Sequence, residues 1–455
     1  RYRKAAGQTL KGDGRLSQAL LKALPFTLTG AQTRSVAEIQ AEMEAPTRML
    51  RLLQGDVGSG KTVVALFAML NAVECGAQAA IMAPTEILAR QHHATIAPLA
   101  ERIGLTVALL TGREKGKSRD AILAGMEDGS ISLVVGTHAL FQEGVAFKDL
   151  GLAVIDEQHR FGVHQRLAMA AKGRGVDVLV MTATPIPRTL ALTVYGDMES
   201  SRLDEKPPGR KPVDTRTLPL DRLEEVTGAV ARAIDAGAKV YWVCPLVEES
   251  ELIDLAAATE RHALLKQRFG NRVGLVHGQM KGTDKDAAMA RFAGGDMAIL
   301  VATTVIEVGV DVPAATVMVI EHAERFGLAQ LHQLRGRVGR GEKPSSCLLL
   351  YAKPLTEAAK ARLNIMRETE DGFRIAEEDL RLRGAGELLG TRQSGLPAFR
   401  VADIFHHHEL LAVARDDARL IVERDMELDS PRGRALRVLL YLFERDNAIK
   451  LLKSG

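Results

Sequence analysis

Short apolar segments alternate with longer, partly polar stretches along the first half of the chain. Six segments of strand length are apolar at nearly every position: residues 49–54, 79–83, 106–110, 132–135, 152–155 and 178–181. Stretches of helical character, such as residues 86–99 and 118–126, lie between them. Strands that are apolar at successive positions are typical of a parallel sheet covered by helices on both faces. The pattern predicts an α/β fold with ligands at the carboxyl ends of the strands.

The alternation stops at residues 204–212 and then resumes. This segment, DEKPPGRKP, holds three prolines, a glycine and five charged residues, a composition typical of a linker. Further strand candidates follow it, at residues 240–243, 273–276, 299–301, 317–320 and 347–351. From residue 353 onward the pattern is helical, strand-poor and neutral in charge. We therefore predict two tandem α/β domains, residues 26–205 and 206–352, and a mainly helical region, residues 353–455.

Composition narrows the class of protein. Hydrophobic residues make up 46% of the 455 positions and charged residues 26%, as in soluble globular proteins. No apolar run approaches the roughly 18 residues of a membrane span, so we expect no membrane association. Cys75, Cys244 and Cys347 lack metal-type spacing, and we interpret them as reduced core thiols of a cytosolic protein.

The amino-terminal residues 1–25 are basic. Six of the first 22 residues are basic and one is acidic, whereas the net charge of the whole chain is only +3. That balance excludes a general polycation and leaves two readings for this segment, a contact with a phosphate backbone or a solvated linker remnant. Because the chain begins at Arg1 rather than Met, we expect an amino-terminal portion to be missing.

Residues 55–62, GDVGSGKT, match the phosphate-loop pattern G-x-x-x-x-G-K-[ST]. A predicted strand precedes them and an apolar helical stretch, residues 63–75, follows. Backbone N–H groups and the helix amino terminus would bind a polyphosphate. Lys61 would contact the β- and γ-phosphates and Thr62 would ligate Mg²⁺. The nucleotide-binding residues expected in this loop are Gly55, Gly58, Ser59, Gly60, Lys61 and Thr62.

Two other segments offer chemistry to the same site. Asp156 and Glu157 end an apolar strand; Asp156 suits Mg²⁺ and Glu157 suits activation of water, although an exposed acidic pair is the alternative. Arg337 and Arg340 lie in a glycine-rich stretch and could stabilise the negative charge that spreads during phosphoryl transfer. By itself, this stretch is equally well interpreted as a basic turn.

Two weaker signals complete the expected site. Gln32 has an amide that could read an adenine edge, although a Thr-x-x-Gln helix start is common. Gly309 and Asp311 lie in an otherwise apolar run that fits a loop facing the same cleft.

Taken in order, these segments resemble the motif series of superfamily 2 helicases. The series comprises Gln32 and residues 55–62, 84–86, 111–112, 136–138, 156–159, 182–184, 277–278, 303–311 and 333–340. The resemblance implies two RecA-like domains that close on ATP, with both arginines facing the γ-phosphate. It implies that Thr182 and Thr184 couple the ATP site to DNA. The residues expected to contact the nucleic-acid backbone are Pro84, Thr85, Thr137, His138, Thr303 and Thr304.

Narrower features resemble the RecG family of branched-DNA helicases. Residues 156–163 and 55–62 are similar to that family, whereas the related transcription-repair coupling translocases usually differ at Gln158 and Ser59. Residues 371–376 and 380–395 are similar to a translocation motif that both groups share, in which a helical hairpin links ATP-driven closure to DNA movement. The residues expected to serve this motif are Arg381, Arg383, Arg392 and Gln393. An ordinary packed helix pair is the alternative.

The resemblance implies an ATP-dependent DNA helicase that remodels stalled forks and Holliday junctions in recombination and repair. It implies ATP and Mg²⁺ as cofactors, and a monomer with branched or duplex DNA and single-stranded-DNA-binding protein as candidate partners. The wedge domain of that family has no counterpart here beyond the basic residues 1–22. The alternatives are a coupling translocase, an RNA helicase, and a nucleotide-gated DNA-binding scaffold without turnover. We interpret His406, His407 and His408 as a solvated patch rather than a metal site.

Overall fold

The structure is a computed structural model. It describes residues 7–142, 144–156, 173, 175–185, 198–245, 251–303, 312, 314–341, 343–390, 408–425 and 427–443. The chain forms two compact units. The larger unit comprises Ala6–Pro185 and Glu199–Leu382, and the smaller comprises Arg1–Ala5, Ile186–Met198 and Arg383–Gly455. Each unit is described separately below.

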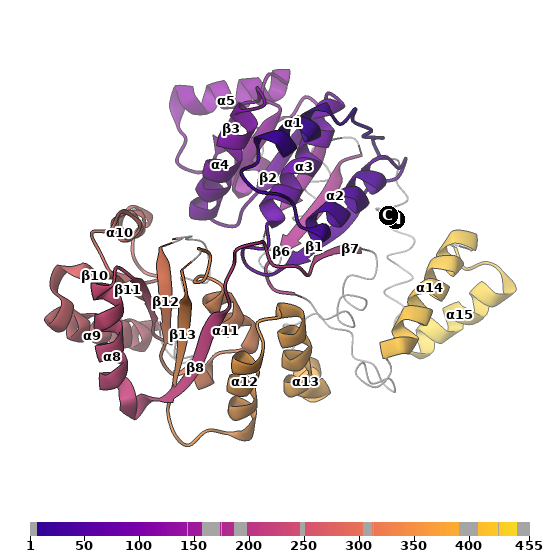
Figure 1. Ribbon diagram of the computed structural model, residues 1–455. Helices are drawn as coiled ribbons and strands as arrows, with labels where there is room; N and C mark the ends of the chain where they lie inside the picture. The colour runs from indigo at the N-terminus through magenta and orange to yellow at the C-terminus, as the bar shows by residue number, and fades with distance from the viewer. Residues whose placement is uncertain are drawn as a thin grey trace. The chain divides into compact units, whose positions relative to one another are not determined.

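A seven-stranded parallel sheet forms the first half of the larger unit, which we call the first lobe (Figure 1). The strand order is β3-β4-β2-β5-β6-β1-β7. The strands are β1 (Leu50–Gly55), β2 (Gln78–Met82), β3 (Val107–Leu110), β4 (Leu133–Gly136), β5 (Leu150–Ile155), β6 (Asp177–Thr182) and β7 (Glu199–Leu203). The first six were predicted to within two residues at either end.

The described helices of the first lobe lie around this sheet. They are α1 (Arg15–Ala23), α2 (Gly30–Met43), α3 (Lys61–Glu74), α4 (Glu86–Glu101) and α5 (Gly116–Asp128), with a short 3₁₀ helix η2 (His138–Phe141). Leu53, Ile81 and Val154 contribute to one core cluster with α3. Because side chains alternate along a strand, the buried Leu52 and Ala80 belong to the opposite face. Burial on both faces explains why these strands are apolar at successive positions.

The basic amino-terminal segment is folded onto this lobe in its described part. Leu10 and Leu20 are buried in the core cluster that includes α3. The Glu74 carboxylate accepts hydrogen bonds from the backbone N–H of Gly14, at 2.9 Å, and of Leu16. Residues 7–23 are therefore not the solvated remnant that charge alone suggested, because the apolar side chains between the charges anchor them.

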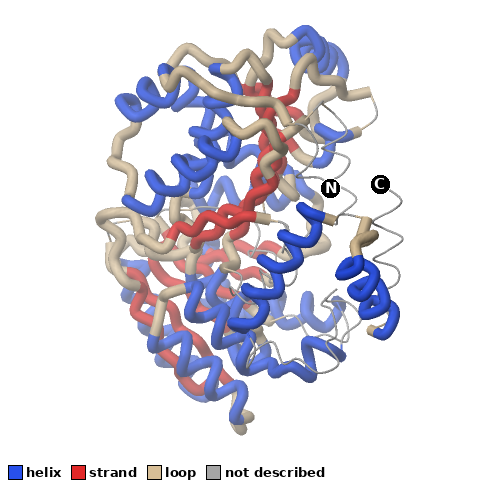
Figure 2. Tube along the Cα trace, turned by 90° about the vertical axis from the view of Figure 1, so that its right-hand side faces the viewer, coloured by secondary structure: helices blue, strands red, loops and turns tan. Residues whose placement is uncertain are grey.

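A six-stranded parallel sheet of order β10-β11-β9-β12-β13-β8 forms the second lobe of the same unit. Its strands are β8 (Val213–Pro219), β9 (Lys239–Val243), β10 (Val273–Val276), β11 (Ile299–Ala302), β12 (Ala315–Ile320) and β13 (Ser345–Tyr351). Trp242 and Val240 of β9 belong to one core cluster, and Tyr241 and Val243 belong to another. The sheet is thus buried on both faces, and Figure 2 shows strands lying between helices.

The helices of the second lobe divide between those two core clusters. Residues of α8 (Leu223–Asp235) and α9 (Glu251–Phe269) join the cluster of Trp242. Residues of α10 (Gly282–Gly294), α11 (Leu328–Arg335) and α12 (Glu357–Glu368) join the cluster of Tyr241. Short 3₁₀ turns lie at η4 (Leu220–Arg222), η5 (Gly270–Arg272) and η7 (Ala323–Arg325).

The described carboxyl-terminal region is helical, as predicted. Helix α13 (Gly372–Gly390) begins in the larger unit and ends in the smaller one, which also contains α14 (His408–Arg424) and α15 (Pro431–Leu442). His406 and His407 lie outside the described residues. Among the described helices, none combines the length and apolar character needed to cross a membrane.

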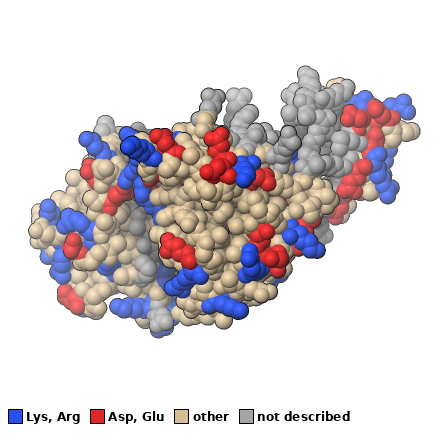
Figure 3. All heavy atoms as spheres, turned by 90° about the horizontal axis from the view of Figure 1, so that it is seen from above, with Lys and Arg blue, Asp and Glu red and all other residues tan. Residues whose placement is uncertain are grey.

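Charges of both signs are interspersed over the described residues of one face of the protein. On the face shown in Figure 3, Lys and Arg side chains alternate with Asp and Glu, and its described residues form no broad area of one sign. This agrees with the small net charge of +3. A nucleic-acid partner would therefore have to be bound by individually placed side chains rather than by bulk charge.

Candidate nucleotide site

The predicted phosphate loop joins β1 to α3. Gly58 and Gly60 have φ angles of 77° and 87°, the left-handed conformation that glycine adopts without steric cost. Gly60 is the N-cap of α3, so the loop ends at a helix amino terminus, where the helix dipole favours an anion. The loop and its helix lie as the sequence predicts.

The Lys61 side chain is folded against the backbone of this loop. Its ammonium donates hydrogen bonds to the carbonyl oxygens of Gly55, at 2.6 Å, and Asp56, at 2.9 Å. The side chain is buried, with only 9% of its residue surface exposed. The loop therefore holds one fixed positive charge at the position that the pattern assigns to phosphate binding.

The two predicted Mg²⁺ ligands, Thr62 and Asp156, meet at one histidine ring. His92 of α4 lies with Nε2 2.6 Å from Asp156 Oδ2 and Nδ1 3.5 Å from Thr62 Oγ1. Asp156 directly follows β5, and its backbone N–H donates to Met82 of the adjacent strand. His92 thus lies between the hydroxyl and the carboxylate and orients the carboxylate through a short hydrogen bond.

His92 was not among the predicted site residues. The sequence nevertheless carries a signal for its position, because Leu88, His92 and Ile96 recur at the spacing of one helix face and all three are buried. A histidine on the apolar face of a helix that follows a strand end must bury its ring among the strand-end side chains. The missing information was which of those side chains it would meet.

Gln32 supports the loop from outside. Its amide oxygen accepts the Thr29 N–H at 2.9 Å and its Nε2 donates to the Ser59 carbonyl at 2.8 Å. A Cβ at Gly60 would lie 2.3 Å from that same Nε2, so only glycine fits there. Gln32 therefore braces the phosphate loop. The adenine contact remains a prediction, for which the second Nε2 hydrogen is the available donor.

The predicted arginine segment packs directly against the phosphate loop. A Cβ at Gly336 would lie 2.8 Å from the Cβ of Val57, so the absence of a side chain lets the two backbones approach. Arg210 of the linker donates to the Val57 carbonyl, at 2.8 Å, and to the Gly339 carbonyl, at 3.0 Å. Arg340 donates to the Gly336 carbonyl at 3.2 Å. The structure thus brings together two segments that lie almost 280 residues apart.

Arg335 has a different place from Arg337 and Arg340. Its guanidinium donates to the carbonyl oxygens of Met366, at 2.6 Å, and Thr369, at 2.9 Å, and burial lowers its pKa. Arg335 is therefore an anchor for the connection between α12 and α13. The two arginines that follow Arg335, namely Arg337 and Arg340, are the predicted catalytic pair.

Three family models match consecutive parts of the chain. A DEAD/DEAH box helicase model matches residues 29–193, and a helicase conserved C-terminal domain model matches residues 221–342. A third model, described as ATP-dependent DNA helicase RecG, domain 3, C-terminal, matches residues 369–447. The first two models correspond to the two sheets, and the third begins just before α13.

Similar proteins extend this match over most of the chain. A protein named ATP-dependent DNA helicase RecG from Acidithiobacillus ferridurans is 54% identical over 419 residues, which are 92% of this chain and 61% of the relative. The protein of the same name from Bacillus subtilis (strain 168) is 50% identical over 437 residues, 96% of this chain and 62% of the relative. This chain is of the RecG type. It spans less than two thirds of the length of these curated relatives.

A solved structure agrees with this assignment. The structure of RecG bound to a three-way DNA junction has a TM-score of 0.77 and 46% identity to this chain, and the match covers 90% of this chain and 54% of that one. The predicted fold class, two RecA-like α/β domains followed by a mainly helical region, is confirmed.

Several side chains for which RecG resemblance predicts a DNA contact or coupling role also stabilise local backbone. Thr85 is the N-cap of α4, where its hydroxyl accepts the Leu88 N–H at 3.3 Å, and Thr137 caps η2 in the same way. The Thr182 and Thr184 hydroxyls lie 2.9 Å apart and close the turn after β6. These contacts do not test the predicted roles. A hydroxyl that accepts one backbone N–H can still form a further hydrogen bond to another partner.

The other predicted DNA residues fall into two groups. Among described side chains, His138 is exposed, Pro84 is half-buried, Thr303 is buried, and Arg381 forms an ion pair with Glu378 at 2.7 Å. The predicted residues that lie outside the described structure are Glu157, Thr304, Gly309, Asp311, Arg392 and Gln393, together with the side chain of Arg383. Their predicted roles stay predictions.

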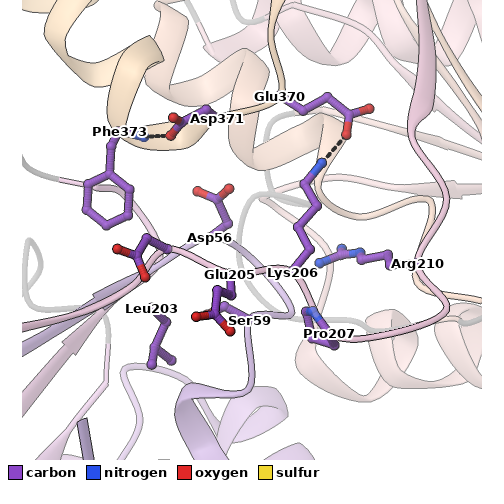
Figure 4. A pocket seen from close by; sticks show the side chains of 11 residues that line it. Asp56, Ser59, Leu203, Glu205, Lys206, Pro207, Arg210, Glu370, Asp371 and Phe373 are labelled. Atoms are coloured by element: carbon purple, nitrogen blue, oxygen red, sulfur yellow. Dashed lines mark hydrogen bonds and ion pairs between the residues drawn. The ribbon is translucent and has the colours of Figure 1, made fainter. Parts of the chain in front are cut away.

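A cavity of about 280 Å³ lies beside the phosphate loop of this RecG-type chain (Figure 4). Asp56 and Ser59 of the loop line it together with linker residues and the start of α13. In Figure 4 the Lys206 side chain reaches across to Glu370, with which it forms an ion pair. The segment predicted to be a linker thus lines part of this cavity.

Proposed function

We propose that this chain is the ATP-driven motor of a RecG-type DNA helicase, an enzyme that hydrolyses the phosphoanhydride bond of ATP to remodel branched DNA in recombination and repair. One observation carries the proposal. The phosphate loop packs against the arginine segment at Val57 and Gly336, within a chain whose residues 369–447 match the RecG domain model. An ATP site and a RecG-type coupling region therefore occur in one chain.

The donor set fits ATP with Mg²⁺. Thr62 offers a hydroxyl and Asp156 a carboxylate, and both contact the same His92 ring. Such oxygen ligands suit Mg²⁺, which retains waters and shares phosphate oxygens with the protein. Bound there, Mg²⁺ would neutralise part of the negative charge of the phosphates.

The side chains of the chain would then divide the reaction among them. Lys61 would bind the β- and γ-phosphates, and Glu157 would orient the attacking water and accept its proton. Arg337 and Arg340 would stabilise the charge that spreads over the transferred phosphoryl group. Because these arginines belong to the second lobe, catalysis would require both lobes to be engaged.

Movement along DNA would follow from the same arrangement. Thr182 and Thr184 would couple the ATP site to the DNA-binding segments, and α13, with Arg381 and Arg383, would convert closure into a step. The four-part division at residues 25, 205 and 352 and the roles of Arg392 and Gln393 belong to this proposal. The monomeric state, the cytoplasmic location and single-stranded-DNA-binding protein as a partner rest on resemblance alone.

Branched DNA is the proposed substrate because the matched RecG structure holds a three-way DNA junction. The match of residues 369–447 to the RecG model favours this reading over a coupling translocase or an RNA helicase. A DNA-binding scaffold without turnover would need no Lys61, Glu157, Arg337 and Arg340 together.

The test is steady-state ATP hydrolysis with forked, linear duplex and single-stranded DNA at equal nucleotide concentration. We expect strong stimulation that is greatest with the fork, and loss of hydrolysis in Glu157→Gln. Absent turnover, or turnover that ignores DNA, would contradict the motor. Equal stimulation by fork and linear duplex would contradict branch preference in this chain and leave the motor standing.

A further inference from the structure

The first residue of α13 lies where three segments of the ATP site converge. A Cβ at Gly372 would lie 1.9 Å from Asp56 Oδ1 of the phosphate loop, 2.7 Å from His332 Nε2 of α11, and 2.9 Å from Pro185, which follows the Thr182–Thr184 turn. Real Cβ atoms do not approach other atoms so closely. The position therefore accepts only glycine while these three neighbours stay in place.

Asp56 contacts the start of α13 and the second lobe with one carboxylate. Its Oδ1 lies 3.1 Å from His332 Nε2, and its Oδ2 accepts the Gly372 backbone N–H at 3.4 Å. Burial would raise the pKa of Asp56, but the hydrogen bond with His332 and the positive charge of Lys61 hold it below its ordinary value. The carboxylate is therefore ionised at neutral pH and bonded on both oxygens.

A second path leads from the same histidine to the same connection. His332 Nδ1 lies 3.1 Å from Arg335 Nη2, and Arg335 donates to the carbonyl oxygen of Thr369, three residues before α13. The Asp371 carboxylate in turn accepts the Phe373 N–H at 2.9 Å in the first turn of the helix (Figure 4). The start of α13 is thus held by Asp56 directly and by His332 through Arg335.

The charge of Asp56 makes this junction sensitive to nucleotide. A carboxylate in a phosphate loop repels bound phosphates, because like charges at short range disfavour each other in a poorly hydrated site. Lys61 now donates to the Asp56 carbonyl and lowers the pKa of its carboxyl. A lysine ammonium that also binds phosphates divides its three N–H donors between them and the loop carbonyls, so nucleotide binding alters the surroundings of Asp56.

We propose that Asp56 is a positioning residue that ties nucleotide occupancy of the phosphate loop to the placement of α13, with Gly372 as the contact point and His332 as its counterpart in the second lobe. The proposal rests on the proposed motor function. It assigns a role to a loop position that the phosphate-binding pattern leaves variable. Linkage requires the effect to be reciprocal, so that a change at Gly372 alters nucleotide binding as well.

Hydrogen exchange tests this coupling between nucleotide binding and the start of α13 without relying on enzymatic activity. The probe is ADP with beryllium fluoride, added to the wild type and to Asp56→Asn, which keeps the side-chain shape but turns an N–H₂ or a neutral oxygen toward the Gly372 N–H. We expect the analogue to change the exchange rate of the amides at positions 372–374 about fivefold or more in the wild type and not in the variant. The exposed Asp235→Asn, in α8, is the matched control and should behave as wild type.

A nucleotide response of these amides that persists in Asp56→Asn would overturn the proposal. So would the absence of any response in the wild type. Neither result would touch the motor function, which the DNA-stimulated hydrolysis of the wild type decides separately.

A glycine substitution supplies a second, mechanical test. Gly372→Ala should increase the ATP consumed per base pair of DNA displaced about fivefold or more, since the added methyl group displaces the helix start from Asp56. Gly228→Ala in α8, where a Cβ meets nothing nearer than 3.8 Å, is the control and should leave this ratio unchanged. Combined with Asp56→Ala, Gly372→Ala should cost less than the product of the two single effects, because both remove one contact. Independent effects in the double variant, or a normal ratio in Gly372→Ala, would contradict the tie.

Discussion

The two lobes of the larger unit are alike in architecture and different in how they offer charge to a nucleotide. Each is a parallel sheet with helices packed on it, and in each the functional segment borders a helix end. The first lobe offers a glycine turn, Gly58 to Gly60, with Lys61 folded onto the backbone. The second offers Arg337 and Arg340 after the end of α11. We therefore expect the backbone turn to bind the nucleotide and the two arginine side chains to complete the site.

This difference explains why the two segments must touch. The turn of the first lobe is closed by its own residues, since Gln32 braces it and Lys61 fills it. The position of the arginine segment relative to the loop is set by the Gly336–Val57 approach and by Arg210. The comparison predicts that substitutions in the phosphate loop of the first lobe abolish ATP binding. Substitutions of the arginines in the second lobe should abolish ATP hydrolysis instead.

The largest expected effect is in the first lobe. Lys61→Ala removes the lysine ammonium that contacts the carbonyl oxygens of the loop, so ATP binding and hydrolysis should both fall below detection. Equilibrium binding of a fluorescent ATP analogue measures this directly. Lys206→Ala, which removes a cation from the cavity wall beside the loop, is the control and should still bind the analogue.

A smaller effect is expected at the histidine between the proposed metal ligands. His92→Ala frees the Asp156 carboxylate to rotate, so the Mg²⁺ concentration needed for half-maximal hydrolysis should rise about tenfold or more. His93→Ala removes the adjacent ring, which contacts the Val107 carbonyl instead, and should leave the Mg²⁺ dependence unchanged. Equal Mg²⁺ curves for His92→Ala and the wild type would show that His92 only fills space.

The smallest effect concerns stability and distinguishes the lobes again. Burial raises the pKa of Asp177, at the start of β6, to about 8, while burial raises that of Cys347, in the second sheet, to about 12. The native state therefore keeps a proton on Asp177 that the unfolded chain releases near its ordinary pKa. Stability should fall as pH rises from about 4 to 8 and then level off.

Asp177→Asn removes that titration. The amide oxygen can still accept the Met49 N–H, which Asp177 accepts at 2.7 Å, so the fold should be kept. Thermal unfolding at pH 5 and pH 8 should show a smaller pH dependence in the variant than in the wild type. Cys347→Ser, in the second lobe, should retain the wild-type pH dependence even though it lowers the melting temperature.

The interior strands of both sheets and the edge strands β3 and β10 could be predicted from the sequence, whereas the edge strands β7 and β8 could not. Interior strands such as β5 and β11 are buried on both faces and stand out as apolar runs. The strands β7 and β8, on either side of the linker, were missed because each pairs with a single neighbour and carries polar side chains, as in ESSRL and VDTRTLP. An edge strand with polar residues at alternate positions leaves no continuous apolar signal, whereas the edge strands β3 and β10 are apolar and were predicted.

The candidate site divides in the same way. The loop at residues 55–62 could be predicted because its chemistry is local, with glycines at positive φ and a lysine at a helix start. The contacts of Asp56 with His332 and Gly372 span 276 and 316 positions of the chain, and no local pattern indicates them. His92 and Arg210 belong to the same category, since their partners are set by how strands and lobes are packed.

The most direct test of the account is a paired measurement on Arg337→Ala, namely equilibrium binding of ATP and single-turnover hydrolysis on forked DNA. If the two lobes supply two halves of one site, the variant should bind ATP as the wild type does and hydrolyse it about a thousandfold more slowly. Arg216→Ala, an exposed arginine of β8, should match the wild type in both measurements. Loss of binding together with turnover, or hydrolysis at the wild-type rate, would contradict the division of labour between the lobes.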